Sequence, residues 1–122
     1  MAVVLSQLST CNRLAVGAVI IKEGRSISHG YNGAPPGMPH CNHTTDEPCL
    51  NAIHAELNAV CFAARQGIPT ENATLYVTVS PCLSCAQALL SAGIQRIVYN
   101  QLYRDQSGLE LLRTAGVECV EL

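Results

Sequence analysis

The sequence predicts an α/β domain in which a five-stranded mixed sheet lies between two layers of helices, a three-layer α/β/α fold. Strand-like and helix-like segments alternate along the chain, in the order β, β, α, β, α, β, α, β after a short first helix. Such alternation is typical of a sheet with helices on both faces and with parallel connections in its later half. A length of 122 residues provides one hydrophobic core and is too short for two ordinary domains. We therefore expect a single domain over residues 1–122.

The first half of the chain predicts a helix, a hairpin and a long loop. Residues 2–8 follow a short helical pattern, which would be marginal alone and must pack on another element. Residues 16–21 form a β-branched apolar run, and after a turn that contains glycine, residues 26–30 can return beside it as a second strand. Residues 32–48 are rich in Pro, Gly, His and Asn, which indicates a functional loop inside the domain.

The second half predicts three helices that alternate with three strands. Gly67 ends the first of these helices, and Ser80 and Pro81 serve as the N-cap and first-turn proline of the second. Cys61 in a helix and Cys119 in the last strand are expected to be small buried residues. The expected helices are 53–65, 81–92 and 109–114, and the expected strands are 75–79, 97–99 and 117–122.

Composition limits the functional classes. Hydrophobic residues make up 48% of the chain and charged residues 13%, which is apolar for a soluble monomer and favours a homo-oligomer. The net charge is −2 and the seven Lys and Arg residues are scattered singly, which favours a small-molecule substrate over a nucleic-acid polymer. Seven cysteines is an odd number, and the sequence shows neither a signal peptide nor a membrane-spanning run. We therefore expect reduced thiols in the cytoplasm, or in the host cell's cytoplasm for a viral protein.

Two motifs predict a catalytic zinc site. The first is His-Ala-Glu at residues 54–56, and the second is Pro-Cys-Leu-Ser-Cys at residues 81–85. One imidazole and two thiolates suit tetrahedral zinc, and three protein ligands leave a fourth position for water. A lone C-x-x-C is commonly a structural zinc half-site or a redox pair. A closed structural site would need a fourth Cys or His, however, and would have no use for Glu56.

The spacing within the motifs constrains the helices that carry them. Cys82 and Cys85 are three residues apart, so they share one face of a helix in its first turns, at the positive end of its dipole. His54 and Glu56 are two residues apart, about 200° around a helix, so they serve one site only if their helix begins beside them. We therefore expect two helix N-termini to converge on the zinc. The bound water would have a pKa of about 7, with Glu56 as the proton carrier.

Longer stretches narrow the family. The pair of motifs is the known signature of zinc-dependent deaminases, and the chain from Ser9 onward resembles the deoxycytidylate (dCMP) deaminases of the cytidine deaminase superfamily. The stretches that carry this resemblance are STCNR at 9–13, VGAVI at 16–20, GYNG at 30–33, PHC at 39–41, HAELNA at 54–59, YVTVSPC at 76–82 and AGVE at 115–118. The resemblance implies the cytidine deaminase-like fold and hydrolysis of dCMP to ammonia and dUMP, which supplies thymidylate synthesis.

The resemblance also implies roles for individual residues. Glu56 would take the proton of the zinc-bound water as hydroxide attacks C4 of cytosine, and would deliver protons to N3 and to the departing ammonia. The residues implied in substrate binding are Asn32 at the deoxyribose, the backbone of Gly17 and Ala18 beside the pyrimidine, Ala55, Tyr103 over the substrate, and Arg65 at the nucleotide, within the chain or across a subunit interface. Asn32 also fits a plain turn, and Arg65 fits a solvated charge at a helix end.

A second metal and several partners are further implications of the resemblance. Many relatives hold a structural zinc at positions that match Cys11, Cys41 and Cys49, and His40 or His43 could complete a closed set of four ligands. Three unrelated reduced thiols are the alternative. The resemblance also implies a hexamer or a dimer-based assembly, and regulation by dCTP and dTTP, with Mg²⁺ accompanying the allosteric nucleotide. The first helix is shorter than is usual in the family, which leaves this regulation open.

Two other functions stay open on the sequence alone. The same fold could deaminate another cytosine nucleotide or nucleoside, or a tRNA adenosine, although the net charge of −2 argues against tRNA. The chain could also be a noncatalytic interaction module that zinc stabilises. Glu56 argues against this module, because a carboxylate beside an open zinc position is costly unless it has a function.

Overall fold

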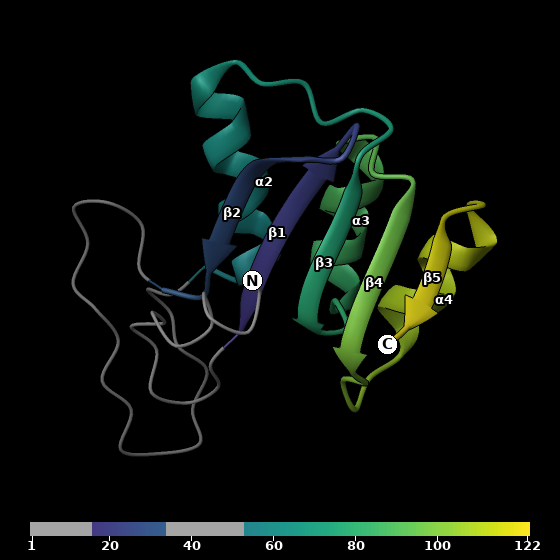
Figure 1. Cartoon of the computed structure of the whole chain (residues 1–122). Coiled ribbons are helices and arrows are strands. Elements are labelled where there is room, and N and C mark those ends of the chain that lie inside the picture. The colour runs from purple at the N-terminus through teal and green to yellow at the C-terminus, as the bar shows by residue number, and fades with distance from the viewer. Residues whose placement is uncertain (1–15, 34–52) are drawn as a thin grey trace.

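The computed structural model describes residues 16–33 and 53–122 (Figure 1). Within these residues the strands and helices follow one another in the predicted order. Some predictions lie outside the described residues. They are the first helix at 2–8, most of the long loop, and the second zinc site at Cys11, Cys41 and Cys49 with His40 or His43.

Five strands form one mixed sheet in the order β2-β1-β3-β4-β5. β1 (Gly17–Lys22) lies between β2 (Arg25–Tyr31) and β3 (Thr74–Val79) and is antiparallel to both. β4 (Arg96–Gln101) and β5 (Glu118–Glu121) extend the sheet in parallel with β3. The later half of the sheet is therefore parallel, as the alternation of strands and helices predicts.

In the described part of the chain, three helices cover one face of the sheet. α2 (Ala55–Gln66), α3 (Leu83–Ser91) and α4 (Ser107–Thr114) lie behind the strands in the view of Figure 1, and α3 contacts both of the others. The core lies between these helices and the sheet, and its fully buried residues include Ile20, Leu75, Ile97, Leu89 and Leu112. These observations confirm the α/β class and the five-stranded mixed sheet. The predicted second layer of helices depends on residues 2–8, outside the described part.

The C-terminal end of α2 agrees with the sequence, whereas the environment of one cysteine does not. α2 ends at Gly67, whose φ of 70° is left-handed and whose N–H bonds back to the helix carbonyls, as predicted. The prediction that Cys61 is buried is wrong, because its position faces outward from α2 while Ala59 and Ala63 face the core. Cys119 is partly buried and packs against the core.

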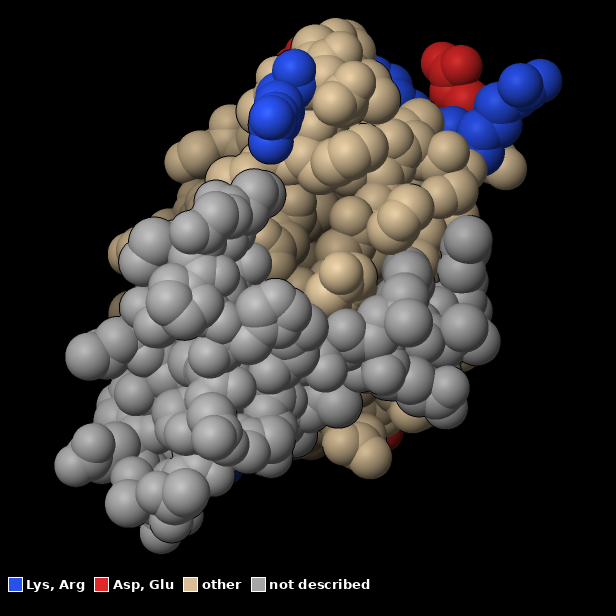
Figure 2. All heavy atoms as spheres, turned by 90° about the vertical axis from the view of Figure 1, so that its left-hand side faces the viewer, with Lys and Arg blue, Asp and Glu red and all other residues tan. Residues whose placement is uncertain are grey.

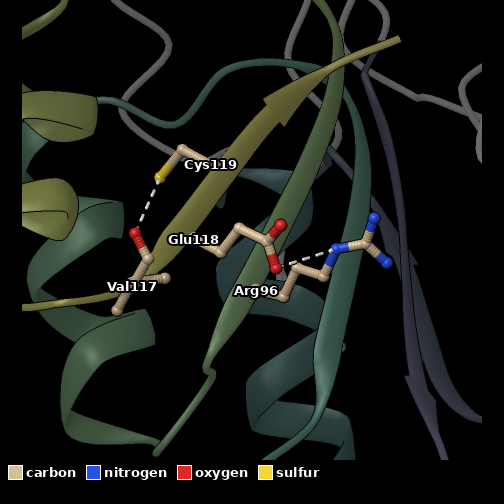
Figure 3. A network of polar contacts seen from close by, with 4 residues as sticks. All are labelled: Arg96, Val117, Glu118 and Cys119. Carbon is tan, nitrogen blue, oxygen red and sulfur yellow. Dashed lines mark hydrogen bonds and ion pairs between the residues drawn. The ribbon is translucent and has the colours of Figure 1, made fainter.

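The end of the sheet where β4 and β5 begin is polar and exposed. Arg96 Nε and Glu118 Oε2 lie 3.4 Å apart on these paired strands (Figure 3), and their side chains are 40% and 65% exposed. Next to them, Cys119 Sγ lies 3.7 Å from the carbonyl oxygen of Val117. This end therefore carries a surface ion pair, and no group that could hold a metal is found here among the described residues.

The surface on the side of β2 and α2 is largely uncharged where it is described. Figure 2 shows that the Lys and Arg side chains of this side stand apart at its upper edge and do not gather into a patch. This agrees with the scattered cationic residues of the sequence. None of the described helices is both long and apolar enough to cross a membrane.

Candidate active site at the N-termini of two helices

The N-terminal ends of α2 and α3 meet beyond the carboxyl end of β3. His54 is the N-cap residue of α2, Cys82 is the N-cap residue of α3, and Cys85 lies in the first turn of α3. His54 Nδ1 is 3.2 Å from Cys85 Sγ and 3.4 Å from Cys82 Sγ. The motif spacing requires two helix N-termini to converge on the donors. The structure agrees, since each helix begins at the residues of its motif.

The three donor atoms fit a zinc ion. The ligand atoms of His54, Cys82 and Cys85 all lie within 4.8 Å of one another, and no other such group occurs among the described residues. Bonds of about 2.3 Å to sulfur and 2.0 Å to nitrogen at a tetrahedral angle would separate the two donors by about 3.5 Å, close to the separations observed. Zinc prefers imidazole and thiolate donors, and three protein ligands leave its fourth position open.

The two thiols of the site hold each other in different protonation states. The pKa of Cys82 is lowered to about 3, mainly by a hydrogen bond from the Cys85 thiol and also by contacts with His54 and with Ser84, whose Oγ is 3.3 Å from Cys82 Sγ. The same interaction raises the pKa of Cys85, and burial adds to the rise. The contact between the two sulfurs favours the thiolate at Cys82, and a cation held by both sulfurs would displace the proton of Cys85.

Glu56 lies buried in the first turn of α2, beside the donors, and is only 4% exposed. Burial raises the pKa of Glu56 to about 7, although a backbone hydrogen bond and the charge of His54 oppose the rise. A carboxyl group with a pKa near neutrality can both accept and donate a proton at that pH. Its position and its pKa therefore suit a proton carrier.

The segment between β3 and α3 is anchored by the end of β4 and by the loop that follows it. The N–H of buried Ser80 donates to Gln101 O over 2.9 Å, and Ser80 Oγ accepts the N–H of Tyr103 over 2.7 Å. The prediction that Ser80 caps the second helix is therefore wrong. Cys82 occupies the N-cap position and Pro81 precedes the helix. The Ser80 hydroxyl accepts the N–H of Tyr103, 23 positions later, and does not cap the helix.

The first turn of α4 also contacts the metal-binding segment. A Cβ atom at Gly108 would lie 2.7 Å from Cys82 O and closer still to Pro81 O, so a side chain at this position would force α4 and the segment apart. Neither Gly108 nor Ser84 was identified from the sequence as a site residue. Their contacts depend on how the helices pack and on the geometry of the C-x-x-C turn, and no local pattern signals them.

Four of the predicted substrate-binding residues lie near the start of α2. Asn32 Oδ1 accepts the N–H of Val16 over 2.8 Å, which joins the end of β2 to the start of β1. Gly33 and Ile53 exchange two backbone hydrogen bonds of 3.1 and 2.7 Å, which attach the same region to the residue before His54. The four residues of this region are Asn32, Gly17, Ala18 and Ala55.

The other two predicted residues differ in their distance from the donors. Tyr103 is partly buried in the loop after β4, where it packs against the core and shares a hollow with Cys82. Arg65 is exposed in the last turn of α2, eleven residues or about 16 Å of helix beyond His54. Within one chain the structure does not bring Arg65 to the donors, so its contact with a nucleotide at the site would require a second copy.

Comparisons with known proteins agree with this geometry. Residues 1–101 match the family described as the cytidine and deoxycytidylate deaminase zinc-binding region. ComE operon protein 2 of Bacillus subtilis (strain 168) is 41% identical over 97% of this chain and 66% of its own length. The deoxycytidylate deaminase of Enterobacteria phage T2 is 38% identical over 96% of this chain and 86% of its own length. This chain therefore spans most of the phage relative and about two thirds of the bacterial one.

A solved structure of similar length has the same fold over nearly the whole chain. The crystal structure of dCMP deaminase from the cyanophage S-TIM5, in complex with dCMP and dUMP, superposes with a TM-score of 0.93 at 33% sequence identity. The match covers 99% of this chain and 90% of the cyanophage chain. The likeness therefore includes the sheet, its helices and the segments that hold the donor set.

Proposed function

The chain belongs to the family of cytidine and deoxycytidylate deaminases, and we propose that it is a zinc-dependent enzyme that hydrolyses dCMP to dUMP and ammonia. The observation that carries this proposal is the open donor set of His54, Cys82 and Cys85 with the buried carboxyl group of Glu56 beside it. The dCMP deaminases of phage T2 and of the cyanophage, similar over nearly the whole chain, support the choice of substrate. The dUMP formed is a precursor for thymidylate synthesis.

The residues of the site have two roles, metal binding and proton transfer. His54, Cys82 and Cys85 would hold zinc, which when bound lowers the pKa of a water molecule to about 7. Glu56 accepts the proton of the attacking water and then delivers protons to N3 and to the amino group of cytosine. A C–O bond forms at C4, the C–N bond breaks, and ammonia leaves. Burial raises the pKa of Glu56, which suits a group that must both accept and donate a proton.

Substrate binding is proposed around the start of α2. The paired backbones of Gly33 and Ile53 and the bond from Val16 to Asn32 support this, because they place the ends of β1 and β2 beside His54. The proposed contacts are Asn32 with the deoxyribose, Gly17, Ala18 and Ala55 with the pyrimidine, and Tyr103 over the substrate.

Further parts of the proposal concern metal content and assembly. We propose a second, structural zinc held by Cys11, Cys41 and Cys49 with His40 or His43. We also propose a cytoplasmic homo-oligomer in which Arg65 reaches the nucleotide of a neighbouring copy, with dCTP and dTTP, together with Mg²⁺, as regulators. Metal analysis tests the second zinc: two ions per chain are expected, and one ion per chain in carefully prepared protein would contradict it.

The main test compares substrates on zinc-loaded protein. Loss of cytosine absorbance and release of ammonia are followed with dCMP, deoxycytidine, CMP and dCTP, and dCMP is expected to have the highest kcat/KM. A preference for deoxycytidine would contradict the nucleotide specificity. Absence of turnover with all four compounds, in protein shown to contain zinc, would contradict the proposed function and favour the noncatalytic module.

A further inference from the structure

The first turns of α2 pack directly on β2, which lies beside the helix in Figure 1. A Cβ atom at Gly30 would lie 2.6 Å from Ala55 O and 2.7 Å from the backbone nitrogen of Ala59, so a side chain at this position would force the helix away from the strand. The hydroxyl group of buried Ser28 donates to Ala59 O over 2.6 Å. The helix that begins at the donor set is therefore held closely against the strand that leads to Asn32.

Asn58 joins the ends of these two elements through its side-chain amide. Its Nδ2 atom donates to Tyr31 O over 2.7 Å and to Ile53 O over 3.4 Å. Tyr31 is the last residue of β2, directly before Asn32, and Ile53 directly precedes His54. A carbonyl oxygen only accepts hydrogen bonds, so the two N–H groups of one amide suit this pair of partners.

Asn58 lies next to the site but is turned away from the reacting groups. Residues two positions apart in a helix lie about 200° apart around it, so Asn58 and Glu56 project from different sides of α2. The contacts of the Asn58 amide are with backbone on both sides. The paired backbones of Gly33 and Ile53 form a second link between the same two segments. Asn58 can therefore affect the reaction only through the segments that it joins.

We propose that Asn58 is a positioning residue of the active site, whose amide holds Asn32 in place relative to the turn of α2 that carries Glu56. The inference rests on the proposed function, in which Asn32 contacts the deoxyribose and Glu56 transfers protons at the base. Only a few bonds separate the sugar from C4 of cytosine. A shift of the end of β2 would therefore move C4 away from the proton carrier, and a misplacement of about 1 Å can cost about 100-fold in rate.

The first test compares Asn58→Ala with Ser28→Ala, which also removes a hydrogen bond between β2 and α2 but at a position farther along the strand from Asn32. Both variants should unfold at a lower temperature than the parent, because each loses a bond that is at least partly shielded from water. On zinc-loaded protein well below that temperature, Asn58→Ala should lower kcat/KM for dCMP by about 10- to 100-fold. Ser28→Ala should keep the kinetics of the parent. An equal loss in both variants, or parent kinetics in Asn58→Ala, would overturn the inference.

Asn58→Asp separates the donated bonds from the shape of the side chain. The carboxylate is close to the amide in size, but it only accepts hydrogen bonds and would face two carbonyl oxygens. Its kcat/KM for dCMP should fall at least as far as that of Asn58→Ala. Parent kinetics in Asn58→Asp would contradict a role for the donated bonds.

A residue that only stabilised the fold would not be coupled to Asn32 in catalysis. Once Asn32→Ala has removed the contact proposed for the sugar, a further Asn58→Ala change should cost little, so the two losses in kcat/KM should not multiply. Losses that multiply in full would show that Asn58 does not act through Asn32.

Amide hydrogen exchange on the zinc-loaded chain, without substrate, tests the positioning apart from turnover. The N–H groups of Gly33 and Ile53 bond across the two segments, so Asn58→Ala should raise their exchange rates by about 5- to 10-fold relative to the amides of β3 and β4. Ser28→Ala should not raise them in this selective way, and unchanged rates in Asn58→Ala would overturn the inference. Failure of the proposed function has a different signature, namely a zinc-containing parent that turns over no cytosine substrate while these exchange rates still respond to Asn58→Ala.

Discussion

The two ends of the sheet hold acidic side chains in opposite environments. At the carboxyl end of β3, Glu56 is 4% exposed and its pKa is raised to about 7 by burial. At the other end, Glu118 is mostly exposed, pairs with Arg96, and has ordinary surface surroundings. A glutamate carboxyl group is therefore a candidate proton carrier at Glu56 and a solvated charge at Glu118. Burial beside the donor set, not residue type, makes the difference.

The ends also differ in how their segments are fixed. At the metal-binding end, Ser80 bonds to the last residue of β4 and to Tyr103 in the loop that follows, and Gly108 lets α4 rest on the backbone of Cys82. At the other end, the ion pair between Arg96 and Glu118 joins two exposed side chains, which contributes about 0–1 kcal/mol to stability. Changes at the first end should affect chemistry and metal binding, and changes at the second should affect neither.

The largest effect is expected for Glu56→Gln, which keeps the shape of the side chain and removes its proton-carrying capacity. General acid–base catalysis contributes about 10²–10⁴-fold, so kcat for dCMP should fall by about that factor or more, while zinc content stays that of the parent. Glu118→Gln makes the same chemical change at the exposed end and should leave kcat unchanged. Equal activity of Glu56→Gln and the parent would contradict the assignment of the proton carrier.

Metal removal should produce the next largest effect, because zinc binds the folded chain at the junction of α2 and α3. At a free zinc concentration about 1,000 times the dissociation constant, bound metal adds about 4 kcal/mol to the free energy of unfolding. Thermal unfolding with and without a chelator measures the contribution. Cys85→Ser should lose the part of the response to chelator that this site contributes, whereas Cys61→Ser changes an exposed cysteine outside the donor set and should respond as the parent does. Equal responses would place the stabilising metal elsewhere.

Gly108→Ala tests the contact between α4 and the metal-binding segment. The added methyl group would overlap the carbonyl oxygens of Pro81 and Cys82, and overpacking of this kind costs about 1–3 kcal/mol. We expect lower stability together with weaker zinc binding, measured by competition with a chromogenic chelator. Gly116→Ala introduces backbone strain at a φ of 90° with no neighbour within 4 Å of the new Cβ, so it should lower stability and leave zinc affinity unchanged.

The two motifs were sufficient to predict which three donor side chains the structure brings together, and their spacing also indicated that α2 begins beside His54. The sequence did not predict the role of Ser80, because a serine before Pro81 carries a local capping signal whereas its actual partner is the N–H of Tyr103. Local patterns predict the hydrogen bonds that a residue can make within a few positions of itself. The partner of Ser80 lies in the loop after β4, which no local pattern brings to it. Gly108 was missed for the same reason, since its contact with Cys82 arises only after α4 has packed.

Ser80→Ala measures how much that later loop contributes to the site. The change leaves the N–H of Tyr103 without its acceptor, which costs about 1–3 kcal/mol for a group shielded from water. We expect a lower midpoint of unfolding and, because the loop that lines the hollow beside Cys82 loosens, a higher KM for dCMP. Ser26→Ala, at an exposed position in β2, should change neither. An unaltered KM in Ser80→Ala would show that the loop keeps its position without this bond.

The smallest effect is expected at the exposed end, in a double-mutant cycle with Arg96→Gln and Glu118→Gln. The 3.4 Å contact is an ion pair, but Arg96 Nε, the one atom of the pair that is itself shielded from solvent, has no partner with hydrogen-bond geometry among the described residues. Both side chains are accessible to solvent and salt, so the coupling measured by urea unfolding should lie between about 0 and 1 kcal/mol and should decrease with added salt. A coupling above about 2 kcal/mol would contradict the contrast between the two ends, because it would require the ion pair to be shielded from water as the groups around Glu56 are.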